Sequence, residues 1–119
     1  MEKHILFILS KPPYSTASAR ESTDAMMAAC AFGQKVSILA LGDSLFQFTS
    51  GQQAQALSLR NTAAMLASLP MYGTEHFYAR EKDLSARNLK PDDFVLPSEP
   101  VTDGEMQSLV AAADVVLSY

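Results

Sequence analysis

Apolar residues along the chain follow two alternating patterns. Short continuous apolar runs are typical of strands buried on both faces of a sheet. Between these runs, apolar residues recur every three or four positions, as they do on one face of a helix. The clearest run is Ile5-Leu6-Phe7-Ile8-Leu9. We predict strands over residues 4–9, 36–41, 75–79, 93–96 and 115–117.

Helix signals lie between the predicted strands. Ser18 with Glu21, and Thr102 with Glu105, fit capping boxes, in which a hydroxyl and a carboxylate satisfy free amides at a helix start. Gly33 is placed to end the first of these helices. Further helices are predicted over 53–68 and 82–87. The repeated strand–helix order predicts an α/β protein of three layers, with a mainly parallel sheet of about five strands.

The composition is that of a single globular domain over residues 1–119. Hydrophobic residues make up 48% of the chain and charged residues 18%, and the net charge is −4. The basic residues are scattered singly, whereas DNA or RNA binding needs a basic patch, so we expect no direct nucleic-acid contact. The longest apolar run is shorter than the ~18 residues that span a membrane. The first run is shorter than the ~7–15 apolar residues of a signal peptide, which predicts a cytoplasmic protein.

Sites in parallel α/β sheets form at the carboxyl ends of the strands, which directs attention to residues 10–18, 42–52 and 79–83. The hydroxyl-rich loop 10–18 suits a phosphate in a small flavodoxin-like binding module. It has no glycine, and Pro12-Pro13 also fits a rigid turn before a capped helix. Acidic residues such as Asp83 and Asp103 are expected to be solvated helix starts.

Cys30 is the only cysteine, so no internal disulfide can form. As a nucleophile or persulfide carrier it would need exposure and a nearby positive group. It instead falls on the apolar face of a predicted helix, near Met26, where a thiol is inert, so we favour a core role. His4 and His76 are not expected to meet a nucleophile, and no metal site or cofactor is predicted.

The segment after the second strand is unusual because a loop there is normally polar. It contains Leu45, Phe46, Gln47 and Phe48, which predicts a surface that a partner covers. The alternative is that both phenylalanines fold back under the loop. The chain ends with an apolar strand and Tyr119, which predicts a tail tied down by the sheet, a partner or both.

Several segments together are similar to one known family. They are Pro13 to Ala25, Gly42 to Gln52, Leu69 to Gly73, Leu84 to Leu89 and Asp114 to Tyr119. The chain resembles the DsrE/DsrF/DsrH-like family, and within it the TusC/DsrF branch. Asn88 stands where glycine is common in that branch, but asparagine tolerates left-handed backbone.

The resemblance implies a subunit of a cytoplasmic sulfur-relay complex rather than an enzyme by itself. Such chains assemble with TusB-like and TusD-like subunits into a heterohexamer, a dimer of heterotrimers. The complex accepts persulfide sulfur from a TusA-like carrier and passes it to a TusE-like one, toward 2-thiouridine at tRNA wobble positions. The DsrEFH relatives act in sulfur oxidation instead.

The resemblance also places the sulfur-carrying cysteine of the TusD/DsrE-type subunit just after the third strand. Arg80 stands at that position here. A guanidinium cannot carry a persulfide, although Arg80 could favour an anionic sulfur on a neighbouring subunit or form a surface ion pair. We therefore predict a non-catalytic subunit, with a sulfurtransferase that uses Cys30 itself as the alternative.

Overall fold

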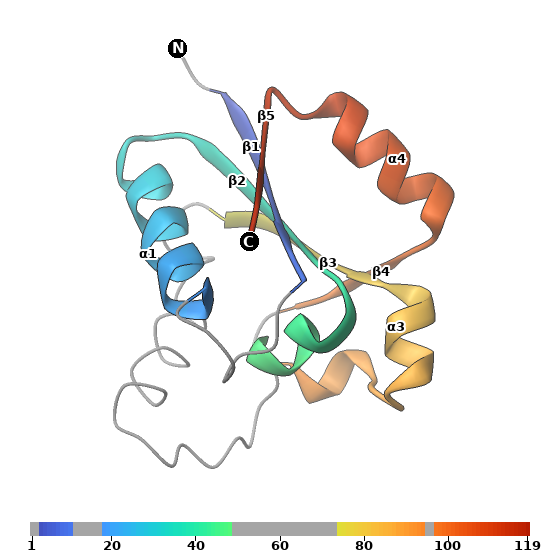
Figure 1. Cartoon of the computed structure of the whole chain (residues 1–119). Coiled ribbons are helices and arrows are strands. Elements are labelled where there is room, and N and C mark those ends of the chain that lie inside the picture. Colours follow the sequence, from blue (N-terminus) through green and yellow to red (C-terminus); the bar gives the residue numbers. More distant parts are fainter. Residues whose placement is uncertain (1–2, 11–17, 49–73, 95–96) are drawn as a thin grey trace.

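The computed structural model describes residues 3–10, 18–48, 74–94 and 97–119 (Figure 1). Its elements are β1 (His4–Leu9), α1 (Ser18–Ala31), β2 (Lys35–Ala40), the 3-10 helix η1 (Gly42–Phe48), β3 (Thr74–Arg80), α3 (Glu81–Ala86), the 3-10 helix η2 (Pro91–Asp93), β4 (Glu99–Val101), α4 (Asp103–Ala112) and β5 (Val115–Ser118). The predicted helix over 53–68 and most of the loop 10–18 lie outside the described residues.

The five strands form one sheet in the order β4-β3-β2-β1-β5, and every neighbouring pair is parallel. The predicted α/β fold with a parallel sheet of five strands is confirmed. Because parallel strands end at the same edge, the carboxyl ends of β1, β2 and β3 lie side by side. In Figure 1 this edge faces η1 and α3.

Helices cover both faces of the sheet, which confirms the three layers. Successive side chains of a strand point to opposite faces. Phe7 accordingly belongs to the core cluster that contains Met26 of α1, whereas Leu6 belongs to the cluster that Met106 of α4 covers. Figure 1 shows α1 and α4 on opposite sides of the strands. In the described part of the chain, no helix has the length and apolarity needed to cross a membrane.

Local backbone signals appear where the sequence predicts them. Gly33 ends α1 with a φ of +78°, and Asn88 adopts a φ of +53°, the left-handed conformation that asparagine tolerates. At the start of α4, the Glu105 N–H donates to Thr102 Oγ1 at 3.2 Å, and the Thr102 N–H donates to the Glu105 carboxylate at 3.0 Å. The second predicted capping box is therefore confirmed.

The predicted strand over 93–96 is not confirmed at its start, and residues 95–96 lie outside the described part of the chain. Asp93 ends the 3-10 helix η2, where its carboxylate accepts a hydrogen bond of 2.8 Å from the Lys90 N–H. The strand that pairs with β3 is β4, at Glu99–Val101. Pro100 has no N–H to donate, but an edge strand tolerates this because one of its sides needs no donor. A search for apolar runs misses a strand with this composition.

Candidate functional site

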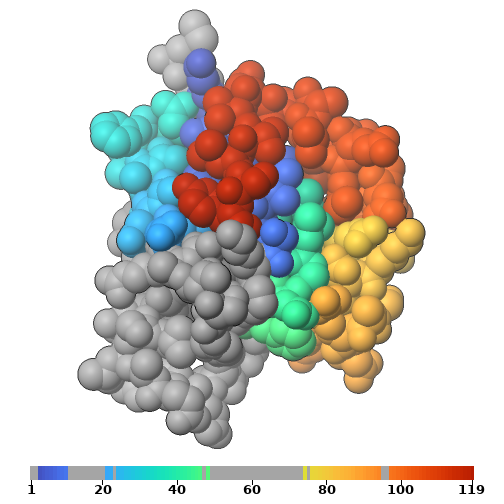
Figure 2. Space-filling view, in the orientation of Figure 1, coloured from blue at the N-terminus to red at the C-terminus, as the bar shows by residue number. Residues whose placement is uncertain are grey.

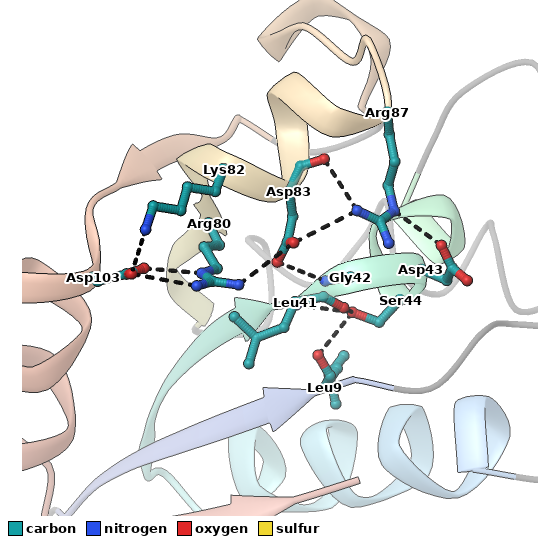
Figure 3. A network of polar contacts seen from close by, with 10 residues as sticks. All are labelled: Leu9, Leu41, Gly42, Asp43, Ser44, Arg80, Lys82, Asp83, Arg87 and Asp103. Carbon is teal, nitrogen blue, oxygen red and sulfur yellow. Dashed lines mark hydrogen bonds and ion pairs between the residues drawn. The ribbon is translucent and has the colours of Figure 1, made fainter.

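Charged side chains gather at the carboxyl edge of the sheet. Arg80 is the last residue of β3, Asp83 follows in α3, and Asp103 begins α4. Figure 3 shows these side chains pointing toward one another. We define the charged cluster as Asp43, Arg80, Lys82, Asp83, Arg87 and Asp103. It lies at the edge where α/β proteins form their binding sites.

Arg80 joins β3 to the start of α4. Its Nε donates to Asp103 Oδ1 at 2.9 Å and its Nη2 donates to Oδ2 at 3.3 Å, while Lys82 Nζ donates to Oδ2 at 3.1 Å. The hydrogen bond from Arg80, followed by that from Lys82, lowers the pKa of Asp103 to about 2. The bond to Asp103 in turn raises the pKa of Arg80. Of the two roles predicted for Arg80, the structure shows the ion pair.

Arg87 and Asp83 join α3 to η1. Arg87 Nε donates to Asp43 Oδ1 at 2.9 Å, and its Nη1 lies 3.5 Å from Asp83 Oδ1. The second oxygen of Asp83 accepts a hydrogen bond of 2.8 Å from the Gly42 N–H. Gly42 has a φ of +55°, which glycine adopts without the strain that a side chain would add. Asp83 thus contacts η1 through Gly42, the end of its own helix through Arg87, and β3 through Arg80, whose Nη1 lies 3.6 Å away.

A buried hydroxyl fastens η1 to the strand ends. Ser44 Oγ accepts a hydrogen bond from the Leu41 N–H at 3.0 Å and lies 2.8 Å from the Leu9 carbonyl oxygen. The side chain is fully buried, so its hydrogen bonds are not exchanged for water. The start of η1, which lies beside the charged cluster, is therefore held by hydrogen bonds to the ends of β1 and β2.

A cavity of about 630 Å³ opens between α3 and the first turn of α4, beside Arg80. It is lined by Glu81, Lys82, Ser85, Val101, Thr102, Asp103 and Gly104. This lining contains neither a thiol nor an imidazole, and in the ranges that the structure describes no group of side chains could hold a metal ion. The arrangement fixes helix starts and can receive a polar group, but it supplies no atom that could carry sulfur covalently.

Cys30 lies far from the charged cluster. Its side chain is 8% exposed within the core, and its Sγ lies 3.7 Å from Oγ1 of Thr74, the first residue of β3. Arg80 ends the same strand, and at ~3.3 Å per residue the two ends of β3 are ~20 Å apart. The core role predicted for Cys30 is confirmed.

The aromatic segment divides into buried and exposed side chains. Leu45 and Phe48 are completely buried, and the ring centroids of Phe48 and Phe77 are 4.6 Å apart. The expectation that a partner covers these two side chains is corrected, because they complete the core of their own chain. Phe46 is 38% exposed and stays a predicted interface residue. The side chain of Gln47 lies outside the described residues.

The spacing of the apolar residues in this segment indicates which of them are buried. Leu45 and Phe48 are three residues apart, and side chains at that spacing share one face of a 3-10 helix. The segment was expected to be a loop, in which spacing has no such meaning. The charged cluster was not predicted either, because the pairing of Arg80 with Asp103 depends on the position of β4 beside β3.

The sheet anchors the end of the chain. The Tyr119 N–H donates to the Ile8 carbonyl at 2.8 Å, the Ser10 N–H donates to the Tyr119 carbonyl at 3.0 Å, and the ring of Tyr119 stacks on Phe7 at 6.0 Å. An interface role for Tyr119 therefore stays a prediction.

The two histidines lie apart from Cys30. His4 Nε2 is 2.8 Å from Ser37 Oγ at the amino end of the sheet, and His76 Nδ1 is 2.6 Å from Glu99 on the edge pair β3–β4. These contacts join the two rings to Ser37 and Glu99, at positions separate from Cys30 and Thr74.

A family model described as DsrE/DsrF-like matches residues 3–119. The chain belongs to the DsrE/DsrF-like family. A protein from Pseudomonas aeruginosa named "Protein TusC homolog" is 32% identical over 118 residues, which cover 99% of each chain. A protein of the same name from Vibrio vulnificus is 28% identical over 115 residues, covering 97% of this chain and 98% of the relative. The resemblance found in the sequence is therefore confirmed.

Solved structures agree on the fold. The ychN protein from E. coli superposes with a TM-score of 0.79 at 16% identity, with each chain fully covered. A protein of unknown function from Methanobacterium thermoautotrophicum superposes with a TM-score of 0.73 at 11% identity, covering 99% of this chain and 100% of that one. At these identities the likeness concerns the fold alone.

Proposed function

We propose that this DsrE/DsrF-like chain is a non-catalytic, cytoplasmic subunit of a sulfur-relay complex. The observation that carries the proposal is the pairing of Arg80 with Asp103 at the position where the family resemblance places a sulfur-carrying cysteine. The only thiol of the chain is buried about a strand's length away. The chain then shapes the complex, and the persulfide travels on cysteines of its partners.

The charged cluster supports a positioning role. A cation beside a thiol stabilises the thiolate, but Arg80 already faces two carboxylates, Asp103 at 2.9 Å and Asp83 at 3.6 Å. Its charge is thus largely compensated within the chain. In this proposal Arg80 holds the start of α4 against the end of β3. The cavity beside it then keeps a constant shape for a neighbouring subunit.

The proposed partners are TusB-like and TusD-like chains, in a heterohexamer made of two heterotrimers. The names of the relatives and their nearly complete overlap with this chain support that assignment. Sulfur would arrive from a TusA-like carrier and leave to a TusE-like one, in the route to 2-thiouridine in tRNA. The net charge of −4 is consistent with a chain that does not itself contact the tRNA.

The test of sulfur transfer uses the complex purified from co-expressed host subunits. With Cys30→Ser, we expect transfer of labelled persulfide sulfur to the TusE-like carrier at the wild-type rate. Replacing the reactive cysteine of the TusD-like subunit by serine is the positive control and should abolish transfer. Loss of transfer by Cys30→Ser in an intact complex would contradict the proposal and favour a sulfurtransferase that uses Cys30.

The test of assembly compares two exposed phenylalanines. Phe46 is 38% exposed beside the carboxyl edge of the sheet, and Phe32 is 82% exposed at the end of α1. We expect Phe46→Asp to prevent co-purification of the partner subunits, whereas Phe32→Asp, the same change elsewhere, leaves the complex intact. Equal behaviour of the two variants would remove Phe46 from the interface.

A further inference from the structure

Phe46 lies on a short helix that is held from two sides. A 3-10 helix has poor internal hydrogen-bond geometry, so the direction of η1 depends on its contacts with the surrounding elements. On the inner side, Ser44 is hydrogen-bonded to the strand ends, and Leu45 and Phe48 are buried in the core. These contacts determine which face of η1 points inward. They leave its outer side to be fixed by something else.

The outer side of η1 is held by α3. The Gly42 N–H donates to Asp83 Oδ2 at 2.8 Å, and Arg87 Nε donates to Asp43 Oδ1 at 2.9 Å. Asp83 and Arg87 are four residues apart, so they project from the same face of α3. Figure 3 shows both side chains reaching toward η1, and Figure 2 shows η1, in green, at the surface next to the yellow and orange residues that include α3. Two consecutive residues of η1 are thus held by one face of α3.

Arg87 contributes more to this contact than a positive charge. Its Nε binds Asp43, whereas its Nη1 lies 3.5 Å from Asp83 Oδ1. Its Nη2 lies 3.7 Å from the place that a Cβ on Gly42 would occupy, so the guanidinium packs against the start of η1. The side chain is only 23% exposed, and solvent therefore screens these contacts less than those of an exposed pair. A lysine, with one nitrogen on a flexible stem, cannot reproduce this arrangement.

We propose that Arg87 is a positioning residue for the contact between Phe46 and a partner subunit. Through Asp43 and Asp83, Arg87 fixes the angle at which η1 presents the ring of Phe46. This role rests on the proposed function, in which Phe46 belongs to the interface. Without Arg87, the buried side chains keep η1 attached to the core, but its outer side can shift. Partner affinity should then fall by more than stability does, because partly exposed ion pairs contribute little to stability.

Fluorine NMR on the full-length chain, without partners, measures the position of the ring. Fluorophenylalanine replaces Phe46 in one sample and Phe48 in another. We expect Arg87→Gln to shift or broaden the signal at position 46 and to leave the buried position 48 unchanged. Lys90→Gln is the matched control, because it removes the same charge from an exposed side chain nearby, and it should leave both signals unchanged.

The conservative variant separates geometry from charge. We expect Arg87→Lys to alter the signal at position 46 as Arg87→Gln does, because it keeps the charge but loses the planar group. A wild-type signal at position 46 in Arg87→Gln would overturn the proposal. An equally large change at position 48 would overturn it too, because Arg87 would then support the core as a whole.

Binding to the co-expressed partner subunits tests the consequence for assembly. We expect Arg87→Gln to bind them about 10-fold more weakly than the wild type, while Lys90→Gln binds normally. Its melting temperature should fall far less than that of Phe48→Ala. Normal binding by Arg87→Gln, when Phe46→Asp fails to bind, would overturn the role of Arg87 alone. Normal binding by Phe46→Asp would instead refute the proposed interface.

Discussion

The two ends of β3 have opposite character. At its carboxyl end lies Arg80, which is accessible and polar. Among the described residues, none of those that line the cavity between α3 and α4 carries a thiol. At its amino end, Thr74 contacts Cys30, a thiol enclosed by apolar side chains. Accessibility and sulfur chemistry are thus separated within this chain, and for that reason we assign it a positioning role in sulfur transfer.

Moving the thiol from the amino end of β3 to its carboxyl end should produce the largest effect, measured as the rate of thiol labelling. We expect a maleimide to label native Cys30 at least ~100-fold more slowly than the unfolded chain, because reaction requires opening of the core. Arg80→Cys in a Cys30→Ser background moves the thiol to the accessible end and should be labelled rapidly in the native state. Fast native labelling of Cys30 would show that the core opens readily and would contradict the comparison.

The same contrast between buried and accessible positions applies to the aromatic segment. Phe48→Ala removes a fully buried ring that packs on Phe77, and we expect it to lower the free energy of unfolding by about 3–5 kcal/mol. Phe46→Ala is the matched change at a half-exposed ring and should cost about 1 kcal/mol or less. Urea unfolding followed by circular dichroism measures both. Similar losses would place Phe46 in the core too.

The smallest effect is expected at the charged end, where solvent screens the ion pairs. The pKa of Asp103 in the folded chain, about 2, lies below its ordinary value of 3.8. Its contribution to stability is therefore complete above about pH 4 and is lost as the pH falls through 2. Asp103→Asn should lower the melting temperature slightly at pH 7 and leave it unchanged near pH 2.

A control at the exposed turn sharpens that prediction. Asp92→Asn makes the same chemical change at an exposed position of η2. We expect its melting temperature to follow that of the wild type across the pH range. If both variants changed stability equally, overall charge rather than the bond to Arg80 would be responsible.

The sequence was sufficient to predict the elements that local chemistry determines. Apolar runs such as that in β1, and the capping pair Thr102 and Glu105, depend on residues close together in the chain. The position of β4 was not predictable in this way, because Pro100 is acceptable only on an edge strand, and strand order is a property of the whole sheet.

The candidate site was less predictable for the same reason. The carboxyl edge itself follows from the strand–helix order, and Arg80 was identified there. Its partner Asp103 is 23 residues away along the chain and comes close only because β4 lies beside β3. The burial of Leu45 and Phe48 likewise depends on η1 folding back over the core.

The central claim is that sulfur passes through the complex without residing on this chain. The most direct measurement is intact-subunit mass spectrometry of the assembled complex after loading with a persulfide donor. The account predicts that a TusD-like partner gains the mass of one sulfur atom, while this chain keeps its unmodified mass. Sulfur found on Cys30 of the native complex would contradict the account.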